Sequence, residues 1–116
     1  ADRGSKPMLI NFWASWCGPC VKEMPAIAEF ARRNPQVSVV GLAVNDDVGA
    51  SRKFAREHDI RFPLGIDRQA EVLSSYGGSG LPVTVLVGAD GKVITTFIGG
   101  LTTGDLDDMA RLAEAG

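Results

Sequence analysis

The two cysteines of the chain, Cys17 and Cys20, stand two residues apart in the stretch "NFWASWCGPC". Three kinds of site use such a pair: a structural disulfide, half of a metal centre, or a reactive dithiol. A disulfide across so short a loop stabilises a protein by only about 2 kcal/mol. A tetrahedral zinc site usually needs four ligands, and the other strong ligand, His58, is far away in the sequence. The reactive dithiol is therefore favoured over the other two.

The spacing gives the two thiols different surroundings. Pro19 is typical of a first helical turn, so Cys17 just precedes a helix and Cys20 lies within its first turn. The unpaired N–H groups and partial positive charge of a helix N-terminus stabilise a thiolate at Cys17. Cys20 is expected to point back toward the sheet and to be shielded. An exposed Cys17 would then attack a partner disulfide, and Cys20 would resolve the mixed disulfide.

Neighbouring residues are expected to complete this site. Gly18 permits the close approach of a partner, and Pro19 sets the first helical turn. Trp16 offers an apolar platform beside Cys17, although packing at a strand end is the alternative. Trp13 is expected in the core.

Hydrophobic patterns predict the elements that position the cysteines. Strands are predicted at residues 8–14, 37–44, 62–66, 82–87 and 92–98. Helices are predicted at residues 19–34, 49–59 and 67–76, and from residue 102 or 103 onward. Asp90-Gly91 between the last two strands is a strong hairpin signal. The order βαβαβαββα predicts an α/β fold, in which helices flank a mixed central sheet.

Charge and hydropathy exclude several partners. Twelve basic and fourteen acidic residues give a net charge of −2, so no concentrated basic surface for nucleic acid or lipid is expected. The longest nearly apolar stretch, "MLINFWA", is far too short to span a bilayer. We therefore expect no nucleic-acid partner and no direct insertion of this chain into a membrane. A hydrophobic content of 45% is enough for a core that needs no staple.

Several motifs together resemble one branch of a known fold. "FWASWCGPC" resembles the thioredoxin fold, and "CVKEMP", "VNDD" and "YGGSGLPVTVLVGADGKV" narrow the resemblance to the TlpA/ResA/DsbE branch of thiol-disulfide oxidoreductases. The resemblance runs from about Gly4 to the last helix. It implies a single thioredoxin-like domain over residues 1–116, with a helix-strand insertion at about 46–67 after the second strand. A β-hairpin that usually precedes this domain in the family is missing from the sequence.

The resemblance also assigns residues near the cysteines. Pro82 in "GLPVT" matches a cis-proline that faces the cysteines, whereas the sequence alone indicates an ordinary trans-proline at the start of an edge strand. The backbone of Leu81 would then pair with a substrate segment, and Leu81 would influence the choice of partner.

Glu23 lies three residues after Cys20, on the same helix face, so we expect it to be partly shielded. ResA-like proteins have a Glu in this place, which implies a carboxylate of raised pKa that shuttles the proton of Cys20. The alternative is a first-turn Glu that interacts with the helix dipole. Ordinary thioredoxins carry a buried Asp where this chain has Asn11. Since Asn cannot accept a proton in that way, Glu23 is the substitute.

The resemblance implies a protein-disulfide reductase with no cofactor beyond its own cysteine pair and with no metal. Its partners would be proteins that carry thiols or disulfides, such as cytochrome c maturation apoproteins or copper-handling proteins, and a membrane or soluble electron donor. We expect a monomer in the periplasm or another extracytoplasmic compartment, with or without a membrane anchor in the full-length protein.

Two other functions stay open. Thiol peroxidases of this fold surround the reactive cysteine with a Thr and an Arg, and neither lies near Cys17 in the sequence. A non-catalytic binding module would use the groove of the fold as a peptide interface. The intact cysteine pair argues against this module.

Overall fold

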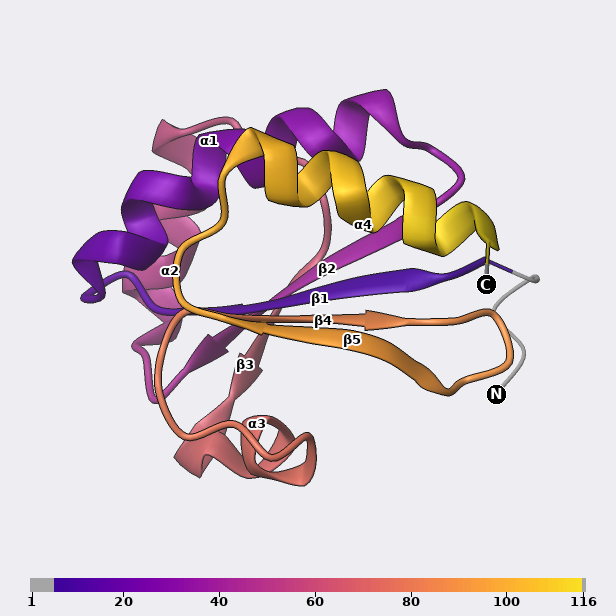
Figure 1. Cartoon of the computed structure of the whole chain (residues 1–116). Helices are drawn as coiled ribbons and strands as arrows, with labels where there is room; N and C mark the ends of the chain where they lie inside the picture. The colour runs from indigo at the N-terminus through magenta and orange to yellow at the C-terminus, as the bar shows by residue number, and fades with distance from the viewer. Residues whose placement is uncertain (1–5, 116) are drawn as a thin grey trace.

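The sheet that the hydrophobic runs predict is present in the computed structural model, which describes residues 6–115 (Figure 1). The strands are β1 (Met8–Trp13), β2 (Ser38–Val44), β3 (Leu64–Asp67), β4 (Val83–Val87) and β5 (Val93–Ile98). The helices are α1 (Gly18–Arg33), α2 (Val48–Glu57), α3 (Glu71–Ser75) and α4 (Thr103–Ala115), and a 3₁₀ turn, η1 (Arg68–Ala70), precedes α3. Each predicted element is found, with its ends shifted by a few residues.

The strands form one mixed sheet in the order β3-β2-β1-β4-β5. The central strand, β1, runs parallel to β2 and antiparallel to β4, so that Asn11 lies between Gly41 and Thr84. α2 connects the parallel strands β2 and β3, and α2 and β3 lie within residues 46–67, where the resemblance implies a helix-strand insertion. β1 is the central strand, and α1 follows its carboxyl end. The N-terminus of α1 therefore lies near the middle of the end of the sheet at which β1 and β2 terminate.

The side chains of β1 alternate between two buried layers, as the pleat of a strand requires. Leu9 and Trp13 join the cluster built with α1, α2 and α4, whereas Ile10 and Phe12 join the cluster that contains Leu73 of α3. Figure 1 shows α1 and α4 above the sheet and α3 below it. Burial on both faces explains why β1 is apolar at every position except Asn11, rather than alternating between apolar and polar residues.

One predicted helix differs in detail. The helix expected over residues 67–76 is divided into η1 and α3 because Gln69 and Ala70 have positive φ angles of 60° and 57°. The carboxylate of Asp67 accepts hydrogen bonds from the backbone nitrogens of Val72 and Leu73, each at 2.9 Å. Asp67 therefore satisfies two backbone N–H groups in the first turn of α3, although it lies on the other side of the break.

Candidate active site

Cys17 and Cys20 are joined by a disulfide at the N-terminus of α1, with their Cα atoms 5.3 Å apart. Cys17 is the N-cap residue in an extended backbone conformation, and its Sγ accepts a hydrogen bond of 3.4 Å from the backbone nitrogen of Cys20. Pro19 occupies the first turn, where its missing N–H costs nothing. On reduction, Sγ of Cys17 would face the positive end of the helix, which stabilises a thiolate.

The exposure of the two cysteines corrects one expectation. Cys17 was expected to be exposed, but in the disulfide form it is only 7% exposed, against 1% for Cys20. The order is as predicted, but the difference is small because Sγ of Cys17 is bonded inward to Cys20 and lies against the first turn. The surface around the disulfide is formed instead by the exposed residues Gly18 and Pro19 and by Trp16, which is 62% exposed.

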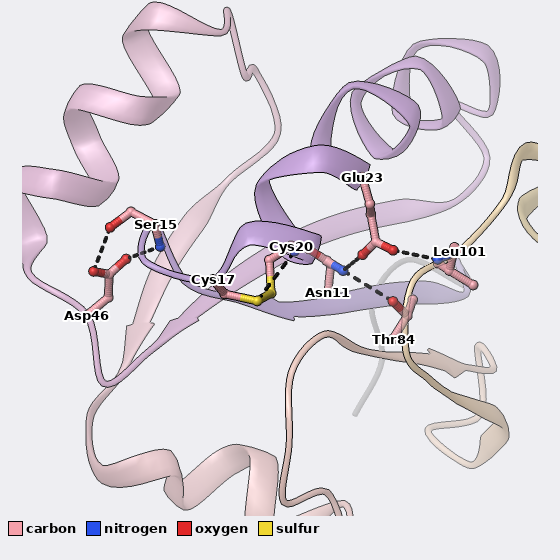
Figure 2. The surroundings of a disulfide bond; sticks show 8 residues. All are labelled: Asn11, Ser15, Cys17, Cys20, Glu23, Asp46, Thr84 and Leu101. Carbon is pink, nitrogen blue, oxygen red and sulfur yellow. Dashed lines mark hydrogen bonds between the residues drawn. A yellow bond between two sulfur atoms is a disulfide. The ribbon is translucent and has the colours of Figure 1, made fainter.

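Glu23 is buried beneath α1, one turn after Cys20 (Figure 2). Its Oε1 accepts a hydrogen bond of 3.1 Å from Nδ2 of Asn11, and its Oε2 accepts one of 2.6 Å from the backbone nitrogen of Leu101. Burial raises the pKa of Glu23 above its ordinary value of 4.5, while the hydrogen bonds from Leu101 and Asn11 act in the opposite direction. The result is a shielded carboxyl group that holds its proton more tightly than an exposed glutamate does.

Asn11 connects this carboxylate to the neighbouring strand. Its Nδ2 also donates to Oγ1 of Thr84, at 3.2 Å, so both amide protons are used. Its Oδ1 is buried and has no hydrogen-bond partner in the structure. Asn11 is therefore a buried residue whose amide group joins Glu23 on α1 to Thr84 on β4.

A second set of contacts, which the sequence did not indicate, holds the loop between β1 and α1. Asp46 follows β2, and its two carboxylate oxygens accept hydrogen bonds from Ser15: Oδ2 from the backbone nitrogen at 2.7 Å and Oδ1 from Oγ at 2.8 Å (Figure 2). Nε1 of Trp16 donates to the backbone oxygen of Asn45 at 3.1 Å. One signal in the sequence could have indicated these contacts: Asp46 lies two residues after the buried strand β2. Because β2 runs parallel to β1, the two strands end at the same end of the sheet, near the cysteines.

Pro82 follows a cis peptide bond with Leu81, as the resemblance implies. In the antiparallel pair of β1 and β4, Val83 lies opposite Phe12, which places Pro82 at the end of the sheet where β1 leads to the cysteines. Leu81 is partly buried against the cluster that contains both cysteines. Ile98, the last residue of β5, pairs with Val83 at this same end and is 75% exposed.

Among residues 6–115, no three His, Cys, Asp or Glu side chains gather in a way that could hold a metal ion. Nor is any helix in this range long and apolar enough to cross a membrane.

Known proteins resemble the chain in sequence. Residues 1–112 match the Redoxin family. The chain is 34% identical over 112 residues to "Thiol-disulfide oxidoreductase ResA" of Bacillus thuringiensis subsp. konkukian (strain 97-27), which covers 95% of this chain and 65% of that protein. It is 39% identical over 109 residues to ResA of Geobacillus thermodenitrificans (strain NG80-2). This match covers 90% of this chain and 62% of that protein. The chain therefore spans less than two thirds of the length of these relatives.

Solved structures agree with the sequence comparison. A secreted Mycobacterium tuberculosis disulfide oxidoreductase homologous to E. coli DsbE has a TM-score of 0.80 and 28% identity, covering 97% of this chain and 83% of that one. StoA from Bacillus subtilis has a TM-score of 0.80 and 25% identity, and the match covers 90% of this chain and 82% of StoA. The chain belongs to the Redoxin family, and within it to the TlpA/ResA/DsbE-like branch of the thioredoxin fold.

Proposed function

We propose that this chain is a thiol-disulfide oxidoreductase that reduces disulfides of other proteins with Cys17 and Cys20. The observation that carries the proposal is the disulfide between these cysteines at the N-terminus of α1, one turn before the buried carboxyl group of Glu23. The cysteine pair is itself the redox group, so the reaction needs no separate cofactor. Its relatives named as thiol-disulfide oxidoreductases support the same chemistry.

The reaction begins from the reduced dithiol. The thiolate of Cys17 attacks one sulfur of the substrate disulfide, whose S–S bond breaks and releases one substrate thiolate. Cys20 then loses its proton and attacks Sγ of Cys17, which releases the second substrate sulfur and forms the disulfide seen here. Two electrons pass from the dithiol to the substrate, and two protons follow them.

Glu23 is the proposed acceptor of the proton that Cys20 loses. Cys20 and Glu23 are three residues apart on α1 and both are buried, so bulk water has little access to either group. The raised pKa of Glu23 makes its carboxylate a better proton acceptor than an ordinary glutamate. The hydrogen bonds from Asn11 and Leu101 keep the carboxylate in place in its charged form.

The protein substrate would dock on the surface around the disulfide. Trp16, next to Cys17, and Ile98, at the end of the sheet that bears Pro82, are exposed apolar side chains. Gly18 and Pro19, between the two cysteines, are exposed as well. In this proposal the backbone of Leu81, next to Pro82, pairs with an extended segment of the substrate.

The proposal extends to the setting of the reaction. We place the chain, as a single monomeric domain, in the periplasm or another extracytoplasmic compartment, which the description of one structural relative as secreted supports. Electrons would come from a membrane or soluble donor. Gly18 and Pro19 between the cysteines favour a reductant, and the branch suggests cytochrome c maturation apoproteins or copper-handling proteins as substrates.

Reduction of insulin by a small thiol tests the proposal. We expect the wild-type chain to accelerate the reduction, and Cys17→Ala and Cys20→Ala to abolish turnover. If the wild-type chain gives no turnover while both cysteines react with a thiol reagent, the chain is a binding module instead. Turnover of hydrogen peroxide as fast as disulfide exchange would favour a thiol peroxidase.

A further inference from the structure

The loop that carries Cys17 is held from outside by the segment that follows β2. The backbone nitrogen of Cys17 donates to the oxygen of Ala14 at 3.1 Å, so residues 14–17 form a tight turn. Within this turn, Ser15 donates to Asp46 through both its backbone nitrogen and its hydroxyl group. The position of Cys17 therefore depends on a residue 31 positions away from Ser15.

The contacts of Asp46 differ from those of its acidic neighbour. Asp47 is exposed, and its Oδ2 caps α2 by accepting from the nitrogen of Ala50 at 2.9 Å. Asp46 is half-buried and directs one oxygen to each of the two donors of Ser15, while its Oδ1 also accepts from the nitrogen of Asp47 at 2.9 Å. The cap of α2 is thus supplied by Asp47, which leaves the carboxylate of Asp46 to the cysteine loop.

The same segment also orients the exposed indole. Nε1 of Trp16 donates to the backbone oxygen of Asn45, so two adjacent residues after β2 hold two adjacent residues before Cys17. Asn45 is in turn fixed by its own bonds: its nitrogen donates to the oxygen of Asp67 at 3.2 Å, and its Oδ1 accepts from the nitrogen of Gln69 at 2.9 Å.

We propose that Asp46 is a positioning residue for disulfide exchange, which holds the Ser15–Trp16 turn so that Cys17 and the indole of Trp16 meet a docked protein disulfide in a fixed geometry. This role rests on the proposed exchange reaction. Attack on a disulfide is sensitive to small displacements of the reacting atom. Loss of the two contacts to Ser15 therefore reduces the rate even where the thiolate itself is unchanged.

Four variants separate geometry from charge and from folding. Asp46→Ala removes both acceptors. Asp46→Asn removes the charge. Its carbonyl oxygen can accept from the nitrogen of Ser15 and its amide can donate to the hydroxyl, while the bond from the nitrogen of Asp47 is lost. Ser15→Ala removes the hydroxyl contact alone. Asp47→Ala is the matched control, because it removes one negative charge from the adjacent position.

The measurements are the rate constant for reduction of insulin and the pH profile of alkylation at Cys17, both well below the unfolding temperature. We expect Asp46→Ala to lower the insulin rate about tenfold, since it removes two hydrogen bonds that fix the loop. Asp46→Asn should keep most of the wild-type rate, and Ser15→Ala should fall between the two. The rate of alkylation of Cys17 by a small reagent, which needs no docking, should differ from the wild-type rate by less than about twofold in all four variants.

Two results would overturn this role without touching the proposed function. In the first, Asp46→Ala reduces insulin as fast as Asp47→Ala does. In the second, Asp46→Asn loses as much activity as Asp46→Ala, which would assign the effect to the charge or to the bond from Asp47 rather than to the contacts with Ser15. If Asp46→Ala does not fold, Ser15→Ala decides, and a wild-type rate in that variant counts against the role. Failure of the wild-type chain itself to reduce insulin would instead remove the proposed function.

Discussion

Oε2 of Glu23 accepts a hydrogen bond of 2.6 Å from the backbone nitrogen of Leu101, although the two residues are 78 positions apart. This bond ties α1 to the loop between β5 and α4, and Asn11 ties the same carboxylate to the central strand. The carboxyl group that follows the cysteine pair is therefore fixed by segments from three parts of the chain. Its protonation state should affect both stability and exchange.

The stability of Glu23→Gln relative to the wild type should rise as pH increases above 4.5, whatever the cost of the hydrogen bond that the amide loses. The pKa of Glu23 is raised in the folded state, so the folded protein binds its proton more tightly than the unfolded chain does. The wild-type free energy of unfolding therefore falls as pH increases from 4.5 to the folded pKa and then levels off. Each unit by which the pKa is raised corresponds to about 1.4 kcal/mol.

Urea unfolding of wild type and Glu23→Gln at a series of pH values measures this difference. The oxidised form is used because its disulfide cysteines do not titrate. Glu29→Gln, on the exposed face of α1, is the control. A constant difference between wild type and Glu23→Gln over the whole pH range would contradict the raised pKa.

Glu23→Gln should also shift the pH dependence of exchange to higher pH. If Glu23 accepts the proton of Cys20, resolution of the mixed disulfide speeds up as Glu23 ionises. Without the carboxylate, the rate should follow the ionisation of Cys20 alone. Stopped-flow measurement of the resolving step shows this shift, and an unchanged profile would leave Glu23 with only a dipole or packing role.

Cys20→Ala should leave Cys17 able to form a long-lived mixed disulfide with a protein substrate, because the sulfur that resolves it is absent. Non-reducing electrophoresis and mass spectrometry of the trapped complex identify the attacking sulfur. Cys17→Ala should trap nothing. Trapping by Cys17→Ala rather than by Cys20→Ala would reverse the two roles.

Ile98→Ser should weaken the reduction of protein disulfides but not that of small disulfides. Ile98 is 75% exposed at the end of the sheet that bears Pro82, so burying it against a docked partner should strengthen binding. Losing about 1 kcal/mol of apolar burial raises KM roughly fivefold. Val93→Ser, at the other end of β5, is the matched control because Val93 is also exposed, at 49%. Equal effects of the two substitutions would remove Ile98 from the docking surface.

The order of elements and the place of the cysteines could be predicted from the sequence. Continuous apolar runs indicated β1 and β2, and the 3.6-residue spacing indicated α1 and α4. Pro19 after Cys17 indicated where a helix begins. These signals depend on residues within one strand or one helical turn of each other, so they can be recognised before the chain is folded.

The break between η1 and α3 could not be predicted in this way. Gln69 and Ala70 adopt positive φ angles although neither is glycine, and the carboxylate of Asp67 bonds to Val72 and Leu73 across the break. Local preference alone favours one continuous helix here. Contacts that form only in the folded chain overrule it.

The sequence by itself determined the chemistry, because a cysteine pair at the start of a helix has the same helix dipole and spacing in any fold. The tertiary structure decided which groups surround that pair. The contacts of Asp46 with Ser15 and of Glu23 with Leu101 join residues 31 and 78 positions apart. The physical reason is that hydrogen bonds act over about 3 Å, so such partners are set by which strands and loops are neighbours in space.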